Sequence, residues 1–240
     1  MRMFAGPNGS GKSTIKNIVP SEYRGIYINA DDIEREIRAT GRITLTPFKV
    51  NTTLQDVKDF FGSSDLVNSD SHHHWVDKLS IENDAIVFPS EASSSYLASA
   101  TADFIRMNLL QQGLTFTFET VMSHPSKIDI LKKAKALGYR TYLYFIATED
   151  PEINVSRVKY RVSQGGHDVP ADKIRARYVR TMENLFDAIL NSDRAYIWDN
   201  SGGQNDESFV AEAENGALTI MCDQLPDWFQ TYVLDKLSKS

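Results

Sequence analysis

Residues 6–14 read Gly6-Pro7-Asn8-Gly9-Ser10-Gly11-Lys12-Ser13-Thr14 and fit the pattern GxxxxGK[ST] at every fixed position. Glycines leave the backbone bare, so that consecutive N–H groups can turn toward one cluster of phosphates. We expect Lys12 to reach the β- and γ-phosphates and the Ser13 hydroxyl to ligate Mg²⁺. An apolar stretch, Met1 to Ala5, precedes the motif, and a helical stretch from Ser13 to Val19 follows it. This strand-to-helix setting predicts that all nine residues contact ATP.

Composition limits the class of protein and its partners. With 240 residues, 41% of them hydrophobic, the chain can bury a full core, and we expect a single domain over residues 1–240. Its 26 basic and 32 acidic residues give a net charge of −6, which argues against general binding to nucleic acid or to an anionic membrane. The single Cys222 excludes an internal disulfide. The apolar runs are too short to cross a bilayer, and the expected location is the cytoplasm.

Buried-looking apolar runs alternate with helical patterns along most of the chain. The expected strands are 25–29, 114–118, 141–147 and 195–198, and the expected helices include 126–137, capped by Ser126, and one that starts at Asp150. Asn215-Gly216, between two alternating segments, is a strong signal for a β-hairpin near the C-terminus. This alternation predicts an α/β fold of the P-loop kinase type, a parallel sheet flanked by helices.

Residues 41–95 interrupt the pattern and read as an insertion after the second strand. Apart from one short helix near 54–61, the segment is irregular and polar, so substrate binding and surface decoration both remain open. His72, His73 and His74 fall here. Three neighbouring imidazoles cannot all face one ion in a regular element, and a surface loop is favoured over a metal site.

Acidic residues lie at the carboxyl ends of two predicted strands. Asp31 and Asp32 come after the second strand, and Glu119 ends the third, at the sheet edge where parallel α/β proteins bind ligands. A carboxylate there can take a proton from a hydroxyl that attacks the γ-phosphate. Asp31 is the candidate base, with capping of the next helix as the alternative. Glu119 could orient the hydroxyl or bind Mg²⁺ through water, or it is a surface carboxylate.

Several motifs occur in an order that resembles the zeta-toxin family of P-loop kinases, in particular its short stand-alone bacterial members. Beyond the phosphate loop they are Asn29-Ala-Asp-Asp32, Phe118-Glu-Thr120, Gly138-Tyr139, residues 157–161, Gly165-Gly-His167 with Pro170, and Asp199-Asn-Ser201. Family members studied as toxins phosphorylate UDP-N-acetylglucosamine at the sugar 3′-hydroxyl and are held by an antitoxin.

By this resemblance Asp31 takes the position of the base, Glu119 that of an acid in contact with substrate, and Arg161 that of a lid arginine. The lid would cover residues 157–180, with Arg157 near the nucleotide and Arg177 and Arg180 as further candidates. His167 stands where the family has a second lid arginine, and residues 41–95 have no clear counterpart. Guanidinium groups beside Gly165-Gly166 could close over phosphates; a solvated helix face is the alternative.

The function predicted from these residues is transfer of the γ-phosphate of ATP to a hydroxyl of a small molecule, with a UDP-sugar implied by the resemblance alone. An ATP-hydrolysing switch or assembly ATPase is the alternative. Against it, the sequence has no LSGGQ segment and no Asp-Glu pair at the end of an apolar strand. A polynucleotide end kinase is disfavoured by the acidic charge.

Overall fold

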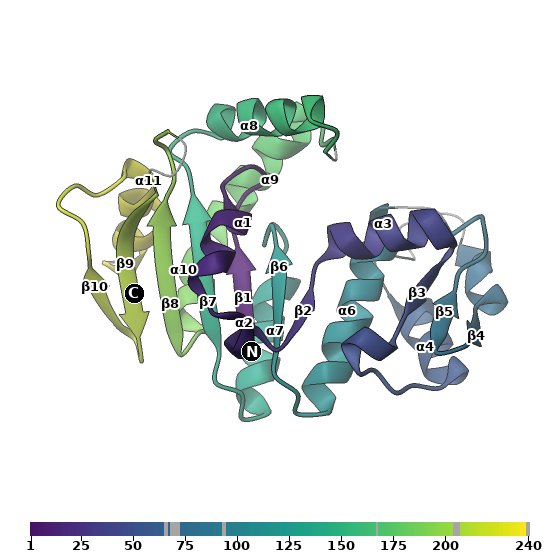
Figure 1. Cartoon of the computed structure of the whole chain (residues 1–240). Coiled ribbons are helices and arrows are strands. Elements are labelled where there is room, and N and C mark those ends of the chain that lie inside the picture. The colour runs from purple at the N-terminus through teal and green to yellow at the C-terminus, as the bar shows by residue number, and fades with distance from the viewer. Residues whose placement is uncertain (65–66, 68–72, 93–94, 167, 204–206, 239–240) are drawn as a thin grey trace. The chain divides into compact units, whose positions relative to one another are not determined.

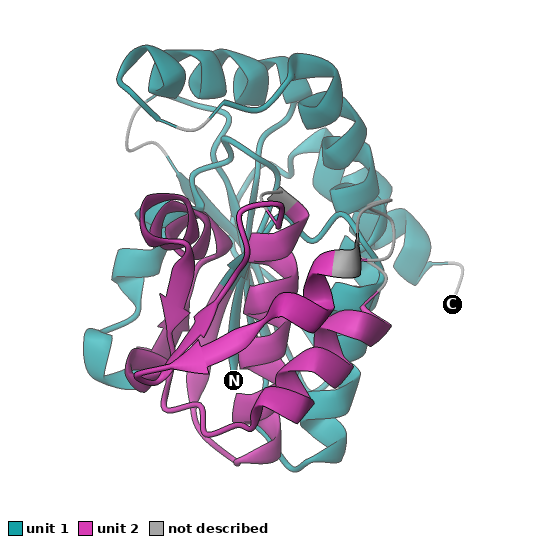
Figure 2. Cartoon of the chain, turned by 90° about the vertical axis from the view of Figure 1, so that its right-hand side faces the viewer, with its two compact units in different colours: residues 1–23, 119–240 teal, residues 24–118 magenta. Residues whose placement is uncertain are grey.

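The computed structural model describes residues 1–64, 67, 73–92, 95–166, 168–203 and 207–238 (Figure 1). By their contacts the residues form two compact units, and Figure 2 colours them separately. Unit 1 comprises residues 1–23 and 119–240, and unit 2 comprises residues 24–118. The predicted insertion, residues 41–95, lies entirely in unit 2.

Unit 1 contains five neighbouring strands of a mostly parallel sheet, in the order β10-β9-β8-β7-β1. The strands are β1 (Arg2–Ala5), β7 (Tyr142–Ala147), β8 (Arg194–Asp199), β9 (Ser208–Glu214) and β10 (Ala217–Ile220). β1, β7 and β8 are parallel, whereas β9 and β10 run antiparallel to their neighbours. Nearly every residue of β7 is buried, as expected for a strand covered on both faces. The predicted α/β class is confirmed.

Short helices of unit 1 follow the strands. They are α1 (Lys12–Ile15), η1 (Lys16–Ile18), α2 (Ser21–Arg24, at the boundary), α7 (Ser126–Ala136), α8 (Pro151–Ser163), α9 (Ala171–Glu183), α10 (Leu185–Leu190), α11 (Asp227–Phe229), the π-helical turn η4 (Gln230–Leu234) and α12 (Asp235–Leu237). Ile15 and Val19 pack on Phe4, Tyr144, Ile146 and Trp198, which fixes α1 to one face of the sheet.

The predicted start of one helix needs correction. Pro125, not Ser126, occupies the N-cap position of α7, and no side chain caps that end. Ser126 is already helical, and its hydroxyl is hydrogen-bonded to His124 Nδ1 at 2.9 Å. By contrast, the Asp150 side chain accepts a hydrogen bond from Glu152 N at the start of α8, as predicted.

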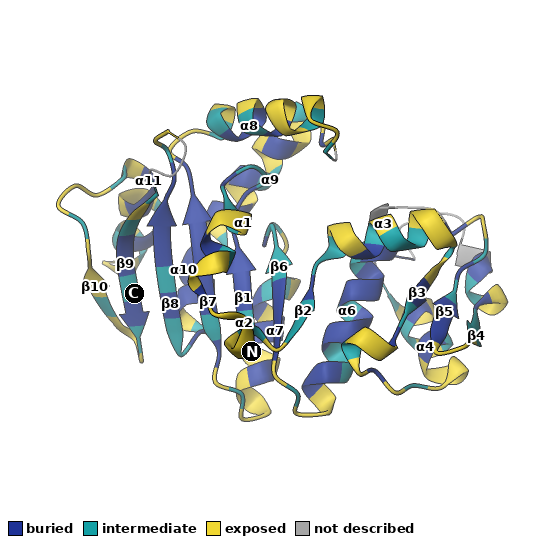
Figure 3. Cartoon of the chain, viewed as in Figure 1, coloured by how far each residue is buried: buried dark blue, intermediate teal, exposed yellow. Residues whose placement is uncertain are grey.

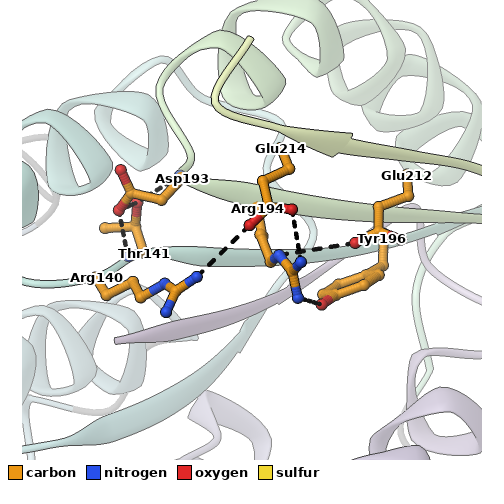
Figure 4. Close-up of polar contacts among 7 residues, drawn as sticks. All are labelled: Arg140, Thr141, Asp193, Arg194, Tyr196, Glu212 and Glu214. Atoms are coloured by element: carbon orange, nitrogen blue, oxygen red, sulfur yellow. Dashed lines mark hydrogen bonds and ion pairs between the residues drawn. The ribbon is translucent and has the colours of Figure 1, made fainter. Parts of the chain in front are cut away.

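The β9–β10 hairpin turns at Asn215 and Gly216, both with positive φ, as the Asn-Gly signal predicts. A polar cluster secures β9 to β8 near the amino ends of β7 and β8 (Figure 4). Arg194 contacts Glu214 at 2.6 Å and Glu212 at 3.7 Å, and Arg140 lies 3.6 Å from Glu214. The hairpin is therefore anchored to the sheet by charge pairs within the chain.

Unit 2 contains a second, three-stranded antiparallel sheet. Its elements are β2 (Ile26–Ile28), α3 (Ala30–Thr40), β3 (Arg42–Thr44), η2 (Thr46–Phe48), α4 (Leu54–Ser63), η3 (His73–Lys78), β4 (Ser80–Glu82), β5 (Ala85–Val87) and α6 (Ser95–Gln111). The small sheet has the order β3-β5-β4. β2 pairs in parallel with β6 (Phe116–Thr120), the strand along which the chain returns to unit 1.

The prediction that residues 41–95 are mostly irregular was wrong. Their strands are only three residues long, too short to show an alternating pattern in the sequence. What holds the segment together is an aromatic cluster in which Phe61 lies 5.9 Å from Trp75 and 5.8 Å from Phe88, between ring centroids. Phe61 and Trp75 are buried. Such contacts between distant residues cannot be derived from local sequence.

Candidate functional site

The loop after β1 has a backbone that only glycine tolerates at two key points. Gly6 and Gly11 adopt φ values of 148° and 104°. A Cβ on Gly6 would lie 2.1 Å from Ile146 O, and a Cβ on Gly11 would lie 2.3 Å from Asn200 Nδ2. These separations are well inside van der Waals contact, so the loop can pack against β7 and the end of β8 only with glycine at both positions.

Two asparagine side chains hold the outside of this loop. Asn154 of α8 is fully buried and donates from Nδ2 to Asn8 O at 2.7 Å. Asn200, directly after β8, donates to Ser10 O at 2.8 Å. Because the two carbonyls are bonded outward, the loop is fixed by its surroundings before any ligand arrives.

The phosphate loop also has backbone N–H groups that are available to a ligand. Among the described residues, the backbone N–H groups of Gly9, Gly11 and Ser13 donate to no protein acceptor. Lys12 Nζ donates to Gly6 O at 2.8 Å and to Pro7 O at 2.9 Å, so that its ammonium group lies over the loop. Unpaired N–H groups and a lysine at a helix start match the needs of a phosphate.

Ser13 is the residue that could hold Mg²⁺. It lies in the first turn of α1, and its side chain is exposed beside the loop. No cluster of three or more His, Cys, Asp or Glu side chains suited to a metal was found within the described part of the chain. A single serine hydroxyl together with phosphate oxygens would suit Mg²⁺, since Mg²⁺ keeps most of its shell as water and substrate oxygens.

Arg157 also belongs to this side of unit 1. It lies on α8 beside Val158, whose methyl group approaches the Gly9 position, and its Nη2 donates to Gly202 O at 2.9 Å. Its Nη1 atom is buried and has no hydrogen-bond partner among the described residues. The structure therefore gathers the phosphate loop, Arg157 and the segment after β8 around one place.

That segment is held by a buried carboxylate. Asp199 accepts hydrogen bonds from Trp228 Nε1 at 2.7 Å and from Ser201 Oγ at 2.8 Å. Ser201 Oγ in turn accepts from Glu149 N at 2.7 Å. Desolvation, together with the negative charges of Asp227 and Asp199, raises the pKa of Glu149 above its ordinary value. Asp199 thus fixes the backbone from which Asn200 reaches the phosphate loop.

Arg161 is exposed one helical turn beyond Arg157, in the last turn of α8. The helix ends in a Schellman motif: Gly166 N donates to Arg161 O and Gly165 N donates to Val162 O, both at 2.9 Å. Gly165 has φ 85°, and a Cβ on Gly166 would lie 2.6 Å from Arg161 Cγ. His167 lies outside the described residues.

α8 and α9 pack on each other through a small core of their own. Val155, Val158 and Ile174 are buried in it. Tyr178 of α9 donates to Thr148 O at 2.6 Å, and burial raises the pKa of its hydroxyl. Arg177 is half-buried and Arg180 is exposed on the same helix.

Glu119 is half-exposed near the end of β6, in unit 1. The loop that follows is fixed from α9 and its end: the Thr181 hydroxyl donates to Val121 O at 2.8 Å, and Asn184 donates to Met122 O at 3.0 Å. Glu119 therefore lies just before a loop whose backbone is fixed by hydrogen bonds at Val121 and Met122.

Asp31 and Asp32 belong to unit 2, and the structure distinguishes them. The alternative role of Asp31 as a helix cap is wrong, because Asn29 is the N-cap of α3 and accepts from Asp31 N at 2.9 Å. Asp32 pairs with Arg35 at 3.0 Å. The Asp31 carboxylate is exposed and has no ion-pair partner among the described residues. Capping is thus removed as an explanation for Asp31.

Sequence reasoning missed the two asparagines that hold the loop. Asn200 lies in the run Asp199-Asn-Ser201, whose only signal in the sequence is the family resemblance, whereas Asn154 sits inside a helix with no local signal. Of the triple histidine, His72 and the side chains of His73 and His74 lie outside the described residues. No described helix has the length and hydrophobicity needed to cross a membrane.

Comparison with known proteins places the chain in a family. The family model of the zeta toxin matches residues 89–202. A protein of Clostridium acetobutylicum named cytidylate kinase is 30% identical over 239 residues, covering 97% of this chain and 96% of that protein. The chain belongs to the zeta-toxin-like family of P-loop kinases.

Solved structures share the fold of this chain at low sequence identity. A chain from the PezAT chromosomal toxin–antitoxin system of Streptococcus pneumoniae superimposes with a TM-score of 0.54 and 16% identity, covering 98% of this chain and 78% of that one. A chain from the AvrRxo1-ORF1:-ORF2 crystal structure with ATP gives a TM-score of 0.50 and 18% identity, covering 91% of this chain. This zeta-toxin-like chain spans 60% of the length of that AvrRxo1 chain.

Proposed function

We propose that this protein transfers the γ-phosphate of ATP to a hydroxyl group of a small molecule. The observation that carries the proposal is the phosphate loop, which is braced by Asn154 and Asn200 and has backbone N–H groups that donate to no described residue. Membership of the zeta-toxin-like family supports kinase-type chemistry. A solved relative of the same fold is a complex with ATP.

The loop and Lys12 would bind the β- and γ-phosphates, since backbone N–H groups and an ammonium group both favour phosphate oxygens. On nucleotide binding, the Lys12 ammonium group would exchange its hydrogen bonds to the carbonyls of Gly6 and Pro7 for hydrogen bonds to phosphate oxygens. Ser13 would hold Mg²⁺, which when bound neutralises phosphate charge. Arg157, whose buried Nη1 has no hydrogen-bond partner among the described residues, would contribute a further donor to the bound nucleotide.

Asp31 is the proposed general base. It would accept the proton of the acceptor hydroxyl as that oxygen bonds to the γ-phosphorus and the bond to ADP breaks. Its exposed carboxylate forms no ion pair with any described residue, whereas that of Asp32 pairs with Arg35. Glu119 would orient the hydroxyl, and Arg161 would neutralise charge on the transferring phosphoryl group.

Two acceptors deserve testing first. A UDP-linked sugar follows from the resemblance to toxins of the family. A cytidine nucleotide follows from the name of the Clostridium relative, whose identity to this chain extends over nearly its whole length, unit 2 included. A UDP-linked sugar offers free hydroxyl groups, whereas a cytidine nucleotide offers both ribose hydroxyls and the oxygens of its phosphate. A new phosphate attached to a phosphate oxygen would contradict the proposed hydroxyl acceptor.

An antitoxin protein is the proposed partner. The support is the fold shared with a chain of a toxin–antitoxin system. Expression of the chain alone should then slow bacterial growth, whereas Lys12→Ala should not. Equal growth with both versions would contradict a toxic role and would leave the kinase proposal untouched.

The kinase proposal is tested by ADP release from ATP and Mg²⁺ with UDP-N-acetylglucosamine, with CMP, or with no acceptor. We expect one acceptor to stimulate ADP release and to gain a phosphate by mass spectrometry. Lys12→Ala should abolish that release while thermal unfolding moves little, because no core contact is lost. Hydrolysis that no acceptor stimulates would contradict the proposal and favour a switch ATPase.

A further inference from the structure

The outer edge of the sheet in unit 1 is an unprotected strand. β10 is the last strand in the order, and among the described residues only β9 pairs with it. Residues 217–222 read Ala-Leu-Thr-Ile-Met-Cys and contain neither a charge nor a proline. Soluble proteins usually guard exposed edges with lysine, proline or a bulge, because unpaired N–H and C=O groups attract further strands.

The register of the hairpin fixes which backbone groups point outward. Ala217 pairs with Glu214 across the two-residue turn, and Thr219 pairs with Glu212. In an antiparallel pair these alternate positions exchange hydrogen bonds with β9, so the N–H and C=O groups of Leu218 and Ile220 face away from the sheet. Met221 N donates to Val210 O at 2.9 Å and continues the same alternation.

An apolar surface adjoins this edge on one face. Leu218 lines a groove between the hairpin, α10 and the C-terminal helical segment. Leu190 of α10 and Leu237 of the C-terminal segment line it as well. Strand alternation places Ile220 on the same face as Leu218. Ile220, Leu190 and Leu237 are 40%, 52% and 48% exposed, and Figure 3 shows exposed positions along β10.

The groove is too small for a cofactor. It encloses about 30 Å³, whereas sites for small molecules usually enclose several hundred Å³. A contiguous apolar surface of this kind beside an open edge is typical of a protein–protein contact.

We propose that β10 pairs antiparallel with β10 of a second copy of this chain, with Thr219 on the two-fold axis. In that register Leu218 of each copy faces Ile220 of the other, and both pairs join outward N–H and C=O groups. The side chains of these pairs lie on the groove face in both copies, so the two apolar surfaces become continuous. A shift of the pairing by one residue would place the outward N–H and C=O groups of one strand opposite residues whose N–H and C=O groups point toward β9. It would also put the apolar side chains of the two copies on opposite faces of the sheet.

The charges near the edge favour a second copy as the occupant. Two chains of net charge −6 repel each other, but β10 itself is uncharged. The acids of the neighbouring strand are neutralised within the chain, because Arg194 contacts both Glu212 and Glu214 and Arg140 contacts Glu214 (Figure 4). Two copies can therefore approach along β10 without bringing unpaired carboxylates together.

The oligomeric state of the full chain gives the first test. We expect light scattering on a sizing column to report a dimer that dissociates on dilution, and Ile220→Lys to be monomeric at every concentration. Leu137→Lys is the matched control, since Leu137 is an exposed apolar residue at the end of α7. A wild-type protein that is monomeric, or a dimer that persists in Ile220→Lys, would overturn the proposal. A different protein would then be the alternative partner of β10.

A second test reads the register and does not depend on the lysine variant folding. In a Cys222→Ser background, Thr219→Cys should form a disulfide-linked dimer on oxidation. Residues facing each other in a non-hydrogen-bonded pair have Cα atoms about 4.5 Å apart, within disulfide range. Ala217→Cys should not cross-link, because two such residues lie roughly 13 Å apart along the strands. Failure of Thr219→Cys, or equal cross-linking at Ala217→Cys, would refute the pairing.

Discussion

Replacing Asn154 by alanine tests whether the phosphate loop is braced by its surroundings. The change removes the amide that donates to Asn8 O at 2.7 Å and that accepts from the Thr148 hydroxyl. Thr148 keeps a contact with Asp150 O at 3.3 Å, and Asn8 is half-buried, so water can reach its carbonyl. With each lost bond worth about 1 kcal/mol, we expect a loss of about 2 kcal/mol in the free energy of unfolding.

For a chain of this size that loss corresponds to a fall in Tm of about 4–8 °C. A loop that is no longer fixed must be ordered by the nucleotide itself. If ordering costs about 1 kcal/mol, ATP binding weakens roughly fivefold. Differential scanning calorimetry gives the first quantity, and isothermal titration with ATP and Mg²⁺ gives the second.

Asn191→Ala is the matched control, because Asn191 also donates from Nδ2 to a backbone carbonyl, that of Asp187 at 2.8 Å, but in an exposed setting. It should leave ATP affinity unchanged and cost little stability. If Asn154→Ala lowers the Tm while ATP binds as before, Asn154 is only a core residue and the bracing argument fails.

Three further outcomes are expected. Asp31→Asn should keep ATP binding but slow transfer by roughly 10²- to 10⁴-fold, and Asp32→Asn should do less in the same single-turnover assay; equal small losses would deny Asp31 the role of base. Arg161→Ala should lower turnover more than nucleotide affinity, and Arg161→Lys should recover only part of the lost turnover. The control Arg140→Ala should change little. If steady-state kinetics and nucleotide titration show a defect in affinity alone, Arg161 is an ordinary binding contact. Because the pKa of Glu149 is raised, its carboxyl group binds a proton more readily in the folded chain than in the unfolded chain. The protonated carboxyl therefore contributes its full stabilisation below the ordinary pKa of glutamate. This stabilisation is lost as pH rises through the raised pKa. Glu149→Gln should therefore flatten the fall in unfolding free energy above about pH 4.5, measured by urea denaturation, and an unchanged slope would contradict this assignment.

The sequence predicts the parallel strands, the phosphate loop and the hairpin well, because each depends on neighbouring residues. Gly6 to Ser13 form a pattern within one loop, and Asn215-Gly216 determine a turn by their own backbone preferences. Unit 2 was misjudged because it depends on contacts such as Phe61 with Trp75, which no local pattern reveals.

The site divides in the same way. Lys12 and Ser13 follow from their motif, whereas the nucleotide contact of Arg157 stays a prediction drawn from the resemblance. Asn154 could not be found from the sequence, since its importance lies in a hydrogen bond to a residue 146 positions away. For Asp31, the sequence left capping and catalysis both open, and only the position of Asn29 in the structure removes the first.

The central claim is that phosphate passes from ATP to a small molecule. The most direct measurement is to incubate the protein with γ-labelled ATP, Mg²⁺ and a bacterial metabolite extract, and to identify labelled products by mass spectrometry. We expect a labelled metabolite whose mass has increased by one phosphoryl group, present with the wild type and absent with Lys12→Ala. Label found only in inorganic phosphate, in equal amount with and without the extract, would contradict it.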